Sequence, residues 1–452
     1  MAHDVADNPY HSPATSDSLA NQPTNIRWWV LGATTLTSFM LYLDRVCISS
    51  ILASNNFQSD VGLDQLQKDW IISGFFWAYA LSQVPAGFLA DKFGARGMMT
   101  FYVATWSICT MVGGLTVGFM SLLWARVGLA ILQAGAYPTS VGLLSTWMPF
   151  RSRAMCSSIV ATGGRIGGAL APILSVWIIM HWGWRSSLFI YGFAGLASAW
   201  LFWSVFRRSP EEHHACNAAE CALIADGRPH TELAARSSTS GMPWGPLLVS
   251  PGMWLNCLVQ FCTNVGWVFI VGQMPGYLRT AKGLSEVEAG WFTTIALICG
   301  MAGMMCGGWL VDRTTRRWGV RWGRAVPIAA ARLASTLAYV SCIWLDDPRA
   351  IVAAIAIVSF TTDLGVGGVW AYTQDVGGRY TGSMLGWANM WGNIGAALSP
   401  LMANYILTNY DANGDWHEVF IAFSIAFIVS AVAALGLDGT KPVVPKERVV
   451  AA

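Results

Sequence analysis

Six ionisable side chains lie inside long apolar runs of this 452-residue sequence. They are Asp44, Arg45, Arg126, Arg165, Arg332 and Asp363. A charged group within a membrane-spanning helix costs at least about 2.5 kcal/mol, so each of these residues is a candidate for a functional role. The planar guanidinium of arginine binds a carboxylate through two parallel hydrogen bonds. A pocket that gathered several of these arginines would therefore bind a small organic anion.

The charges of such a pocket do not cancel. Arg45, Arg126 and Arg165 outnumber the two carboxylates by one, which leaves a positive charge for a carboxylate substrate to neutralise. The arginines could instead pair internally, or with backbone carbonyls, and only hold helices together. For Arg45 and Arg126 we favour substrate binding, whereas for Arg165 and Asp363 both interpretations stay open.

The predicted depths of these residues are consistent with one shared cavity. At about 1.5 Å per residue, Tyr79 and Arg126 lie roughly 13 Å deep from the same side of the membrane. Tyr42 lies on the helix that also carries Asp44, in the same half. We expect Arg332, close to a predicted helix end, to extend its side chain to the inner membrane interface.

The composition requires a membrane around these helices. Charged residues make up 12% of the chain, against about 25% in soluble domains, and hydrophobic residues make up 54%. The 24 Trp and 46 Gly also indicate a membrane protein, because Trp favours the membrane interface and Gly allows close packing of spanning helices. The lipid bilayer is therefore the predicted solvent of most of the chain.

Runs of about 20 apolar residues predict twelve membrane spans. They begin near Trp28, Trp70, Gly97, Phe119, Cys156, Trp184, Met253, Gly290, Ala325, Ala350, Gly382 and Val419. With the N-terminus inside, 18 of the 27 Lys and Arg residues fall in cytoplasmic segments and 5 in external ones. Because basic residues favour the cytoplasmic side, we predict a multi-pass protein of the inner or plasma membrane with both termini in the cytoplasm.

One long polar connection divides the spans into six and six. The expected organisation is a cytoplasmic tail (1–27), a six-helix bundle (28–206), a cytoplasmic linker (207–252), a second six-helix bundle (253–438) and a cytoplasmic tail (439–452). A short helix is expected within the linker, from Asn217 to Ala225.

The two halves share an internal repeat. The stretch GFLADK at 87–92 recurs as GWLVDR at 308–313, and GRIGGALAP at 164–172 recurs as GNIGAALSP at 392–400. The offsets of 221 and 228 residues are close to half the chain. A duplication of this kind is typical of transporters that rock two bundles around a central site.

The stretch GFLADKFGAR at 87–96 resembles the loop signature of the major facilitator superfamily. This resemblance implies an all-α membrane fold of 12 transmembrane helices in two pseudo-symmetric six-helix bundles. We interpret the motif and its repeat as a conformational latch, in which Asp91 pairs with basic groups of the other bundle in one conformation only. The latch residues are Gly87, Asp91, Lys92, Gly94, Arg96, Asp312 and Arg313.

The stretch YLDR at 42–45 resembles the N-Y-x-D-R motif of the anion:cation symporter family, which includes carriers of galactonate, glucarate and hexuronate. Arg126, the 135–138 stretch and GWR at 183–185 are similar to that family too. The resemblance implies that Arg45, Tyr79 and Arg126 contact the substrate carboxylate or its hydroxyls. It also implies polar contacts from the second bundle, by Gln260, Asn264, Trp370, Tyr372, Asn389 and Asn393.

Two positions depart from the family pattern. Leu41 stands where the motif has Asn, and Gln133 stands where many members have a Glu that is thought to bind a proton. Since Gln cannot titrate, proton coupling would fall to Asp44, with Asp363 as the second candidate. We expect fewer protons per substrate than in relatives with both carboxylates, and sodium coupling stays open.

Other functions find little support in the sequence. It contains no H-E-x-x-H or Walker motif and no C-x-x-C pair, so we expect no enzyme activity, metal or cofactor. The basic residues form no dense tract of the kind that binds nucleic acid. A carrier of neutral sugars or a drug exporter remains the alternative, although buried arginines argue against a cationic drug. We expect the chain to function as a monomer.

Overall fold

A computed structural model describes residues 22–226, 244–410 and 415–443, and these residues contain helices and no strands. The remaining parts of the predicted tails and linker, 1–21, 227–243 and 444–452, lie outside the described residues.

The first half of the chain forms one helical bundle. Its elements are α2 (Ile26–Ala53), α3 (Asn55–Val61), α4 (Gln65–Phe93), α5 (Ala95–Gly114), α6 (Phe119–Gln133), α7 (Ala136–Trp147), η1 (Phe150–Ser152) and α8 (Arg153–Val205). The backbone of α8 breaks at Gly183, whose φ of 81° is in the left-handed region that favours glycine. The segment α8 therefore contains two spans.

Short elements connect this bundle to the second. They are η2 (Pro210–Glu212), α9 (Ala218–Ala225) and α11 (Trp244–Val249). The second bundle consists of α12 (Pro251–Val268), η3 (Phe269–Gln273), α13 (Met274–Thr280), α14 (Glu286–Ser341), α15 (Pro348–Leu364), α16 (Val366–Gly377), η4 (Gly378–Tyr380), α17 (Thr381–Asn409) and α18 (His417–Leu435). Helix α14 is also two spans, separated at Gly319 with φ 75°.

The prediction of twelve spans is confirmed in the described chain. Seven helical segments are long and apolar enough to cross a membrane, and two of them, α8 and α14, contain two spans each. Helices α4, α5 and α17 complete the twelve. The predicted linker helix is α9, and it begins where the Asn217 side chain accepts a hydrogen bond from the Glu220 N–H.

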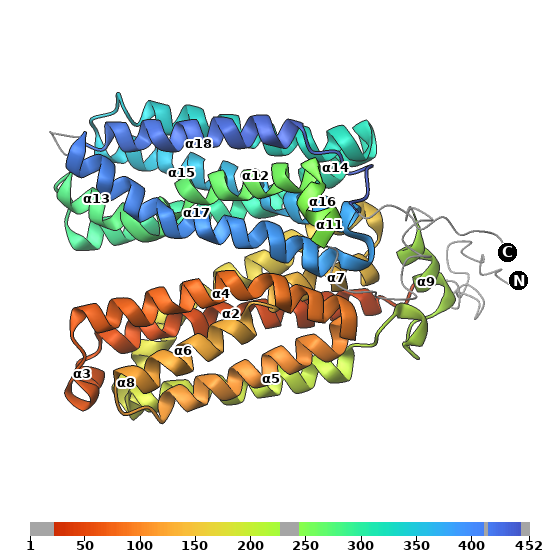
Figure 1. Ribbon diagram of the computed structural model, residues 1–452, viewed down its shortest axis with the longest axis horizontal. Helices are drawn as coiled ribbons and strands as arrows, with labels where there is room; N and C mark the ends of the chain where they lie inside the picture. Colours follow the sequence, from red (N-terminus) through yellow and green to blue (C-terminus); the bar gives the residue numbers. More distant parts are fainter. Residues whose placement is uncertain (1–21, 227–243, 411–414, 444–452) are drawn as a thin grey trace, which may run out of the picture.

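The two bundles lie side by side with their long helices roughly parallel, as Figure 1 shows. We call the end that carries α9 the linker end, and the end that carries α3 and α13 the open end (Figure 1). At the open end, α4 begins with a capping box in which the Gln67 N–H donates to Asp64 Oδ1 at 2.7 Å. The first span of α14 begins there with the same motif, formed by Ser285 and Glu288.

Glycines set the spacing of the helices within each bundle. A Cβ atom on Gly167 of α8 would collide with the Phe39 carbonyl of α2, and one on Gly307 of α14 would collide with the Leu364 carbonyl of α15. Small residues of this kind allow spanning helices to approach closely, since lipid provides no hydrophobic force between them.

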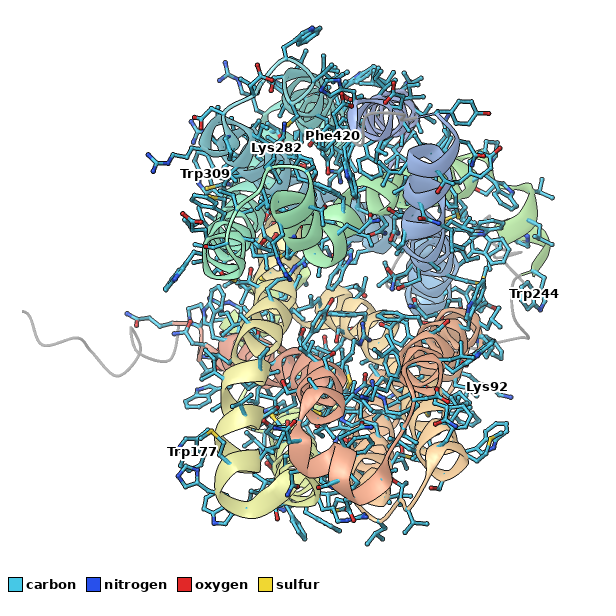
Figure 2. The ribbon with its side chains drawn as sticks, turned by 90° about the vertical axis from the view of Figure 1, so that its left-hand side faces the viewer. Lys92, Trp177, Trp244, Lys282, Trp309 and Phe420 are labelled. Atoms are coloured by element: carbon cyan, nitrogen blue, oxygen red, sulfur yellow. The ribbon has the colours of Figure 1, made fainter. Side chains whose placement is uncertain are left out.

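The outer surface of the bundles is apolar. Trp177 and Trp309 are 52% and 54% exposed, and Figure 2, which views the molecule from the open end, shows both pointing away from the space between the bundles. Exposed apolar side chains around the perimeter fit the hydrocarbon of a bilayer.

Candidate functional site

A cavity of about 620 Å³ lies between the two bundles. This volume suits a small organic molecule. Its walls include most of the residues that the sequence nominated, namely Tyr42, Arg45, Tyr79, Arg126, Arg165, Gln260, Asn264, Asp363, Trp370, Asn389 and Asn393. Tyr372 is not among them: it lines a separate pocket at the linker end with Pro246, Leu255 and Asp438.

One wall of the cavity carries Arg45 of α2 and Arg126 of α6. Arg126 donates to the backbone carbonyls of Asp44 and Arg45, at 3.4 and 3.3 Å, and these bonds fix its side chain against α2. The Arg45 guanidinium lies 4.2 Å from the centre of the Tyr79 ring. Phe75 lies beneath both guanidiniums, at 5.2 Å from Arg45 and 4.6 Å from Arg126. Aromatic faces orient the two cations here without neutralising them.

The Arg45 guanidinium retains free donors. Its Nε and Nη2 atoms are buried and have no hydrogen-bond partner among the described residues. Buried donors without an acceptor are costly, and these two atoms can bind a group that supplies acceptor oxygens.

Asp44 lies behind this wall and not on the cavity surface. Its side chain is fully buried, and neither carboxyl oxygen has a hydrogen-bond partner of good geometry in the described chain. Arg126 connects it to the cavity, because that guanidinium lines the cavity and donates to the Asp44 carbonyl. Asp44 therefore lies next to the cavity without lining it.

A second cationic group lies on the other side of the cavity. Arg165 of α8 donates to the Asp363 carboxylate of α15 across a Nη2–Oδ1 distance of 3.0 Å, which joins the two bundles. The Arg165 guanidinium also lies 4.1 Å from the centre of the Trp267 ring. Of the two interpretations left open for Arg165 and Asp363, internal pairing is observed, and the pair also lines the cavity.

The expectation for Arg332 was wrong. Its side chain is 2% exposed, lines the cavity and donates from Nη1 to the Thr362 carbonyl at 2.6 Å. Arg332 lies thirteen residues beyond the break at Gly319, which is about 20 Å along the helix and places it deep in the span. Extension to the inner interface is excluded by that depth.

The residues between the cavity and the linker end are polar and aromatic. Asn389 of α17 donates to Gln83 of α4 at 2.6 Å, and the Tyr137 and Trp370 rings meet edge to face at 5.0 Å. Tyr137, like Trp267 and Phe75, was not nominated from the sequence, because an aromatic residue in an apolar helix has no distinguishing pattern.

Asp91 joins the bundles at the linker end. It accepts hydrogen bonds from the backbone N–H groups of Gly382 and Ser383, at 2.9 and 2.7 Å, and from the Ser383 hydroxyl at 2.6 Å. These groups lie at the start of α17, where unpaired N–H groups favour an anion. The expected partners were basic groups of the other bundle, whereas the partners in this structure are two backbone N–H groups and a hydroxyl.

Asp312 repeats this contact in the second half. It accepts from the backbone N–H groups of Ala154 and Met155 at the start of α8, at 3.2 and 2.9 Å. It also pairs with Arg324 at 3.3 Å, and Arg324 pairs in turn with Asp375 at 3.0 Å. Sequence spacing did not nominate Arg324 and Asp375, because they meet Asp312 only through the tertiary fold.

Of the other latch residues, Gly87 packs against the opposite bundle, whereas Lys92, Gly94, Arg96 and Arg313 do not join the bundles in the described chain. Lys92 and Arg313 are exposed to the surroundings, and Arg96 donates to the Trp203 carbonyl at 3.0 Å within its own bundle. Gly87 approaches the Gly382 carbonyl so closely that a Cβ atom would collide with it. Gly94, with φ 90°, makes the turn between α4 and α5.

These contacts define the conformation. Asp91 and Asp312 bond to the first residues of α17 and α8, and Asn389 lies about two turns beyond the start of α17. In Figure 1 the start of α17 lies at the linker end. The cavity extends away from these contacts, along α2 as far as Ser49 and along α17 as far as Pro400. The molecule is therefore closed at the linker end, with its cavity directed toward the open end.

Comparisons with known proteins agree with this architecture. The chain is similar to a probable sulfoacetate transporter of Cupriavidus necator, with 28% identity over 92% of this chain and 95% of the relative. It is similar to a probable galactarate/D-glucarate transporter of Bacillus subtilis, with 27% identity over 92% and 93%. It is also similar to a D-galactonate transporter of Escherichia coli, with 26% identity over 92% and 95%.

Solved structures share the fold at low identity. The fucose:proton symporter of Escherichia coli gives a TM-score of 0.67 at 14% identity, over 90% of this chain and 98% of that one. The proton:xylose symporter gives 0.71 at 14% identity, over 92% and 96%. Residues 34–400 match the family model of the Major Facilitator Superfamily. This chain therefore belongs to the Major Facilitator Superfamily and is a membrane transporter, not an enzyme.

Proposed function

We propose that this transporter takes up a small organic anion, such as an aldonate, an aldarate or a uronate, together with protons by alternating access. The observation that carries the proposal is the pair of unbonded donor atoms on the Arg45 guanidinium, beside Arg126 in the cavity wall. A carboxylate supplies the two acceptor oxygens that such a guanidinium lacks. The transporters of sulfoacetate, galactarate/glucarate and galactonate among the relatives support an anionic substrate of this size.

In this proposal different walls of the cavity bind different groups of the substrate. Arg45, Arg126 and Tyr79 hold the carboxylate, and Tyr42 lies beside them. The remaining lining residues bind hydroxyl groups, which need both donors and acceptors: Gln260, Asn264, Trp370, Asn389 and Asn393. Because both bundles of one chain complete the site, the chain functions as a monomer.

We assign the linker end to the cytoplasm of the cell, since the basic loop residues are concentrated on that side. The cavity then faces outward and receives substrate from outside. Inward opening requires Asp91 and Asp312 to leave the N-terminal ends of α17 and α8, so these contacts act as the latch of the outward-facing state.

We assign the coupling proton to Asp44, with Asp363 as the second candidate. Asp44 is buried next to both arginines of the carboxylate site, so a charge that enters the cavity acts directly on its ionisation. A substrate anion and a proton on Asp44 therefore favour each other's binding.

Uptake of labelled glucarate, galactonate and glucuronate into proteoliposomes tests the proposal. An inwardly directed proton gradient should stimulate uptake of at least one of them. Arg126→Ala should abolish uptake, whereas Arg185→Ala, whose side chain binds outside the cavity to Asp60 and the Gly114 carbonyl, should retain it. Uptake that follows a sodium gradient would overturn the assignment to protons, and binding of neutral sugars alone would overturn the anionic substrate.

A further inference from the structure

The cavity carries more positive charge than one carboxylate can neutralise. Four arginines line it, namely Arg45, Arg126, Arg165 and Arg332, and among the described residues Asp363 is the one carboxylate that lines it with them. Asp44 lies behind the lining, next to Arg126. The two carboxylates therefore leave a formal excess of at least two positive charges, and of three when Asp44 carries the coupling proton.

The excess is divided between two places. Arg45 and Arg126 are accompanied by Asp44 and retain at least one uncompensated charge, whether or not Asp44 carries a proton. Arg165 and Arg332 are accompanied by Asp363 and retain another. The two groups stand on different elements, α2 and α6 for the first and α8, α14 and α15 for the second.

The side chains of the second group, Arg165 and Arg332, are fixed in position by their contacts with neighbouring residues. Arg332 donates through Nη1 to the Thr362 carbonyl at 2.6 Å, while its buried Nε has no partner among the described residues. Gly365 leaves room for this guanidinium, because a Cβ atom there would lie 2.6 Å from Arg332 Nη2. The Arg165 guanidinium lies 4.1 Å from the centre of the Trp267 ring, and its side chain is 19% exposed and lines the cavity.

We propose that the cavity has a second anion subsite, formed by Arg165 and Arg332, and that the transported solute is a compact dianion with an acidic group at each end. This inference rests on the proposed function and narrows it. One acidic group binds at Arg45 and Arg126, and the other binds at Arg165 and Arg332, so each group neutralises one excess charge. A monoanion of the same length would leave the second subsite with a buried, uncompensated cation, which is costly.

Matched pairs of ligands that differ by one acidic group test the inference. Suitable pairs are D-glucarate with D-gluconate, galactarate with galactonate, and sulfoacetate with isethionate. Binding to the purified full-length protein is measured by calorimetry and by the shift of its melting temperature. We expect at least one dianion to bind about tenfold or more tightly than its monoanionic partner, as for one charged hydrogen-bonded contact.

Two variants separate the subsites. Arg165→Gln alone would leave the Asp363 charge without its partner and could unfold the protein. The double variant Arg165→Gln/Asp363→Asn removes both charges, so it should fold like the wild type. Arg332→Gln in that background then removes the excess charge and should eliminate the preference for the dianion, while the affinity for the monoanion changes less than about threefold.

The outcomes distinguish the two proposals. Equal affinity of the wild type for both members of every pair, or equal losses for both in the triple variant, would overturn the second subsite and leave the organic-anion function intact. The function itself would be overturned if no carboxylate or sulfonate bound to the wild type. In that case the wild type and Arg45→Gln would show the same absence of a melting-temperature shift with every ligand.

Discussion

The side-chain amide of Gln133 donates a hydrogen bond of 3.3 Å to the backbone carbonyl of Leu41, and both residues are completely buried. These are the two positions at which the sequence departs from the symporter pattern. Leu41 belongs to α2, three residues before Asp44, so this hydrogen bond places Gln133 next to the segment that carries Asp44 and Arg45. A side chain at position 133 thus faces a carbonyl oxygen, which accepts a hydrogen bond and repels a carboxylate.

Gln133→Glu should add a proton to the transport cycle. A glutamate there can bind the Leu41 carbonyl only when it is protonated, and it loses that bond when it ionises. We expect the number of protons per substrate to rise by one, as measured by the reversal potential in proteoliposomes. Gln83→Glu is the control, because Gln83 is also buried but bonds to Asn389 of α17 and not to the helix that carries Asp44. An unchanged reversal potential for Gln133→Glu would contradict the idea.

Asp91→Asn should weaken closure of the linker end. The charge of Asp91 accepts three hydrogen bonds from Gly382 and Ser383, and charge-assisted bonds of this kind contribute about 1.5–3 kcal/mol each. A shift of about tenfold or more toward the alternative conformation is expected.

The readout is labelling of a single cysteine, Ser49→Cys, at the exposed open end of the cavity in a variant without native cysteines. An impermeant maleimide should react more slowly in Asp91→Asn. The neighbouring Lys92→Gln, which changes an exposed side chain, should react at the wild-type rate. Equal rates in all three proteins would exclude Asp91 as a latch.

Gly87→Ala should oppose the same closure by a steric route. The added methyl group would collide with the Gly382 carbonyl, which is backbone and cannot move aside cheaply. Transport should fall about tenfold or more, because the outward-facing state is strained. Gly97→Ala is the matched control, since nothing lies within 4 Å of a Cβ atom there. Normal transport by Gly87→Ala would mean that closure does not need this approach.

Glu220→Ala should destabilise the protein without changing substrate affinity. Glu220 of α9 is fully buried, pairs with Arg27 at 2.9 Å and accepts from the Asn25 N–H at 2.7 Å, so it fastens α9 to the start of α2. Breaking a buried pair costs about 3–5 kcal/mol.

Thermal unfolding in detergent measures this loss. Asp226→Ala serves as the control, because Asp226 is exposed and lies 4.0 Å from Arg151, and such surface pairs contribute about 0–1 kcal/mol. Equal melting temperatures for the two variants would show that Glu220 does not stabilise the fold.

Local chemistry determined much of this protein from sequence alone. Apolar runs long enough to cross a bilayer fixed the number of spans, and the internal repeat related the two halves. The cost of charge in hydrocarbon nominated Arg45, Arg126, Arg165 and Asp363, and all four line the cavity. These properties depend on each residue and its neighbours in the chain, so no tertiary structure is needed to read them.

Contacts between distant helices were decided only by the fold. Arg332 lies in the cavity wall because α14 breaks at Gly319 and carries the residue deep into the span. Asp91 binds the backbone N–H groups of α17, a partner that has no side-chain signature in any sequence. The separation of the four arginines into two pairs was also decided only by the tertiary structure, because it depends on how helices from two bundles meet in space.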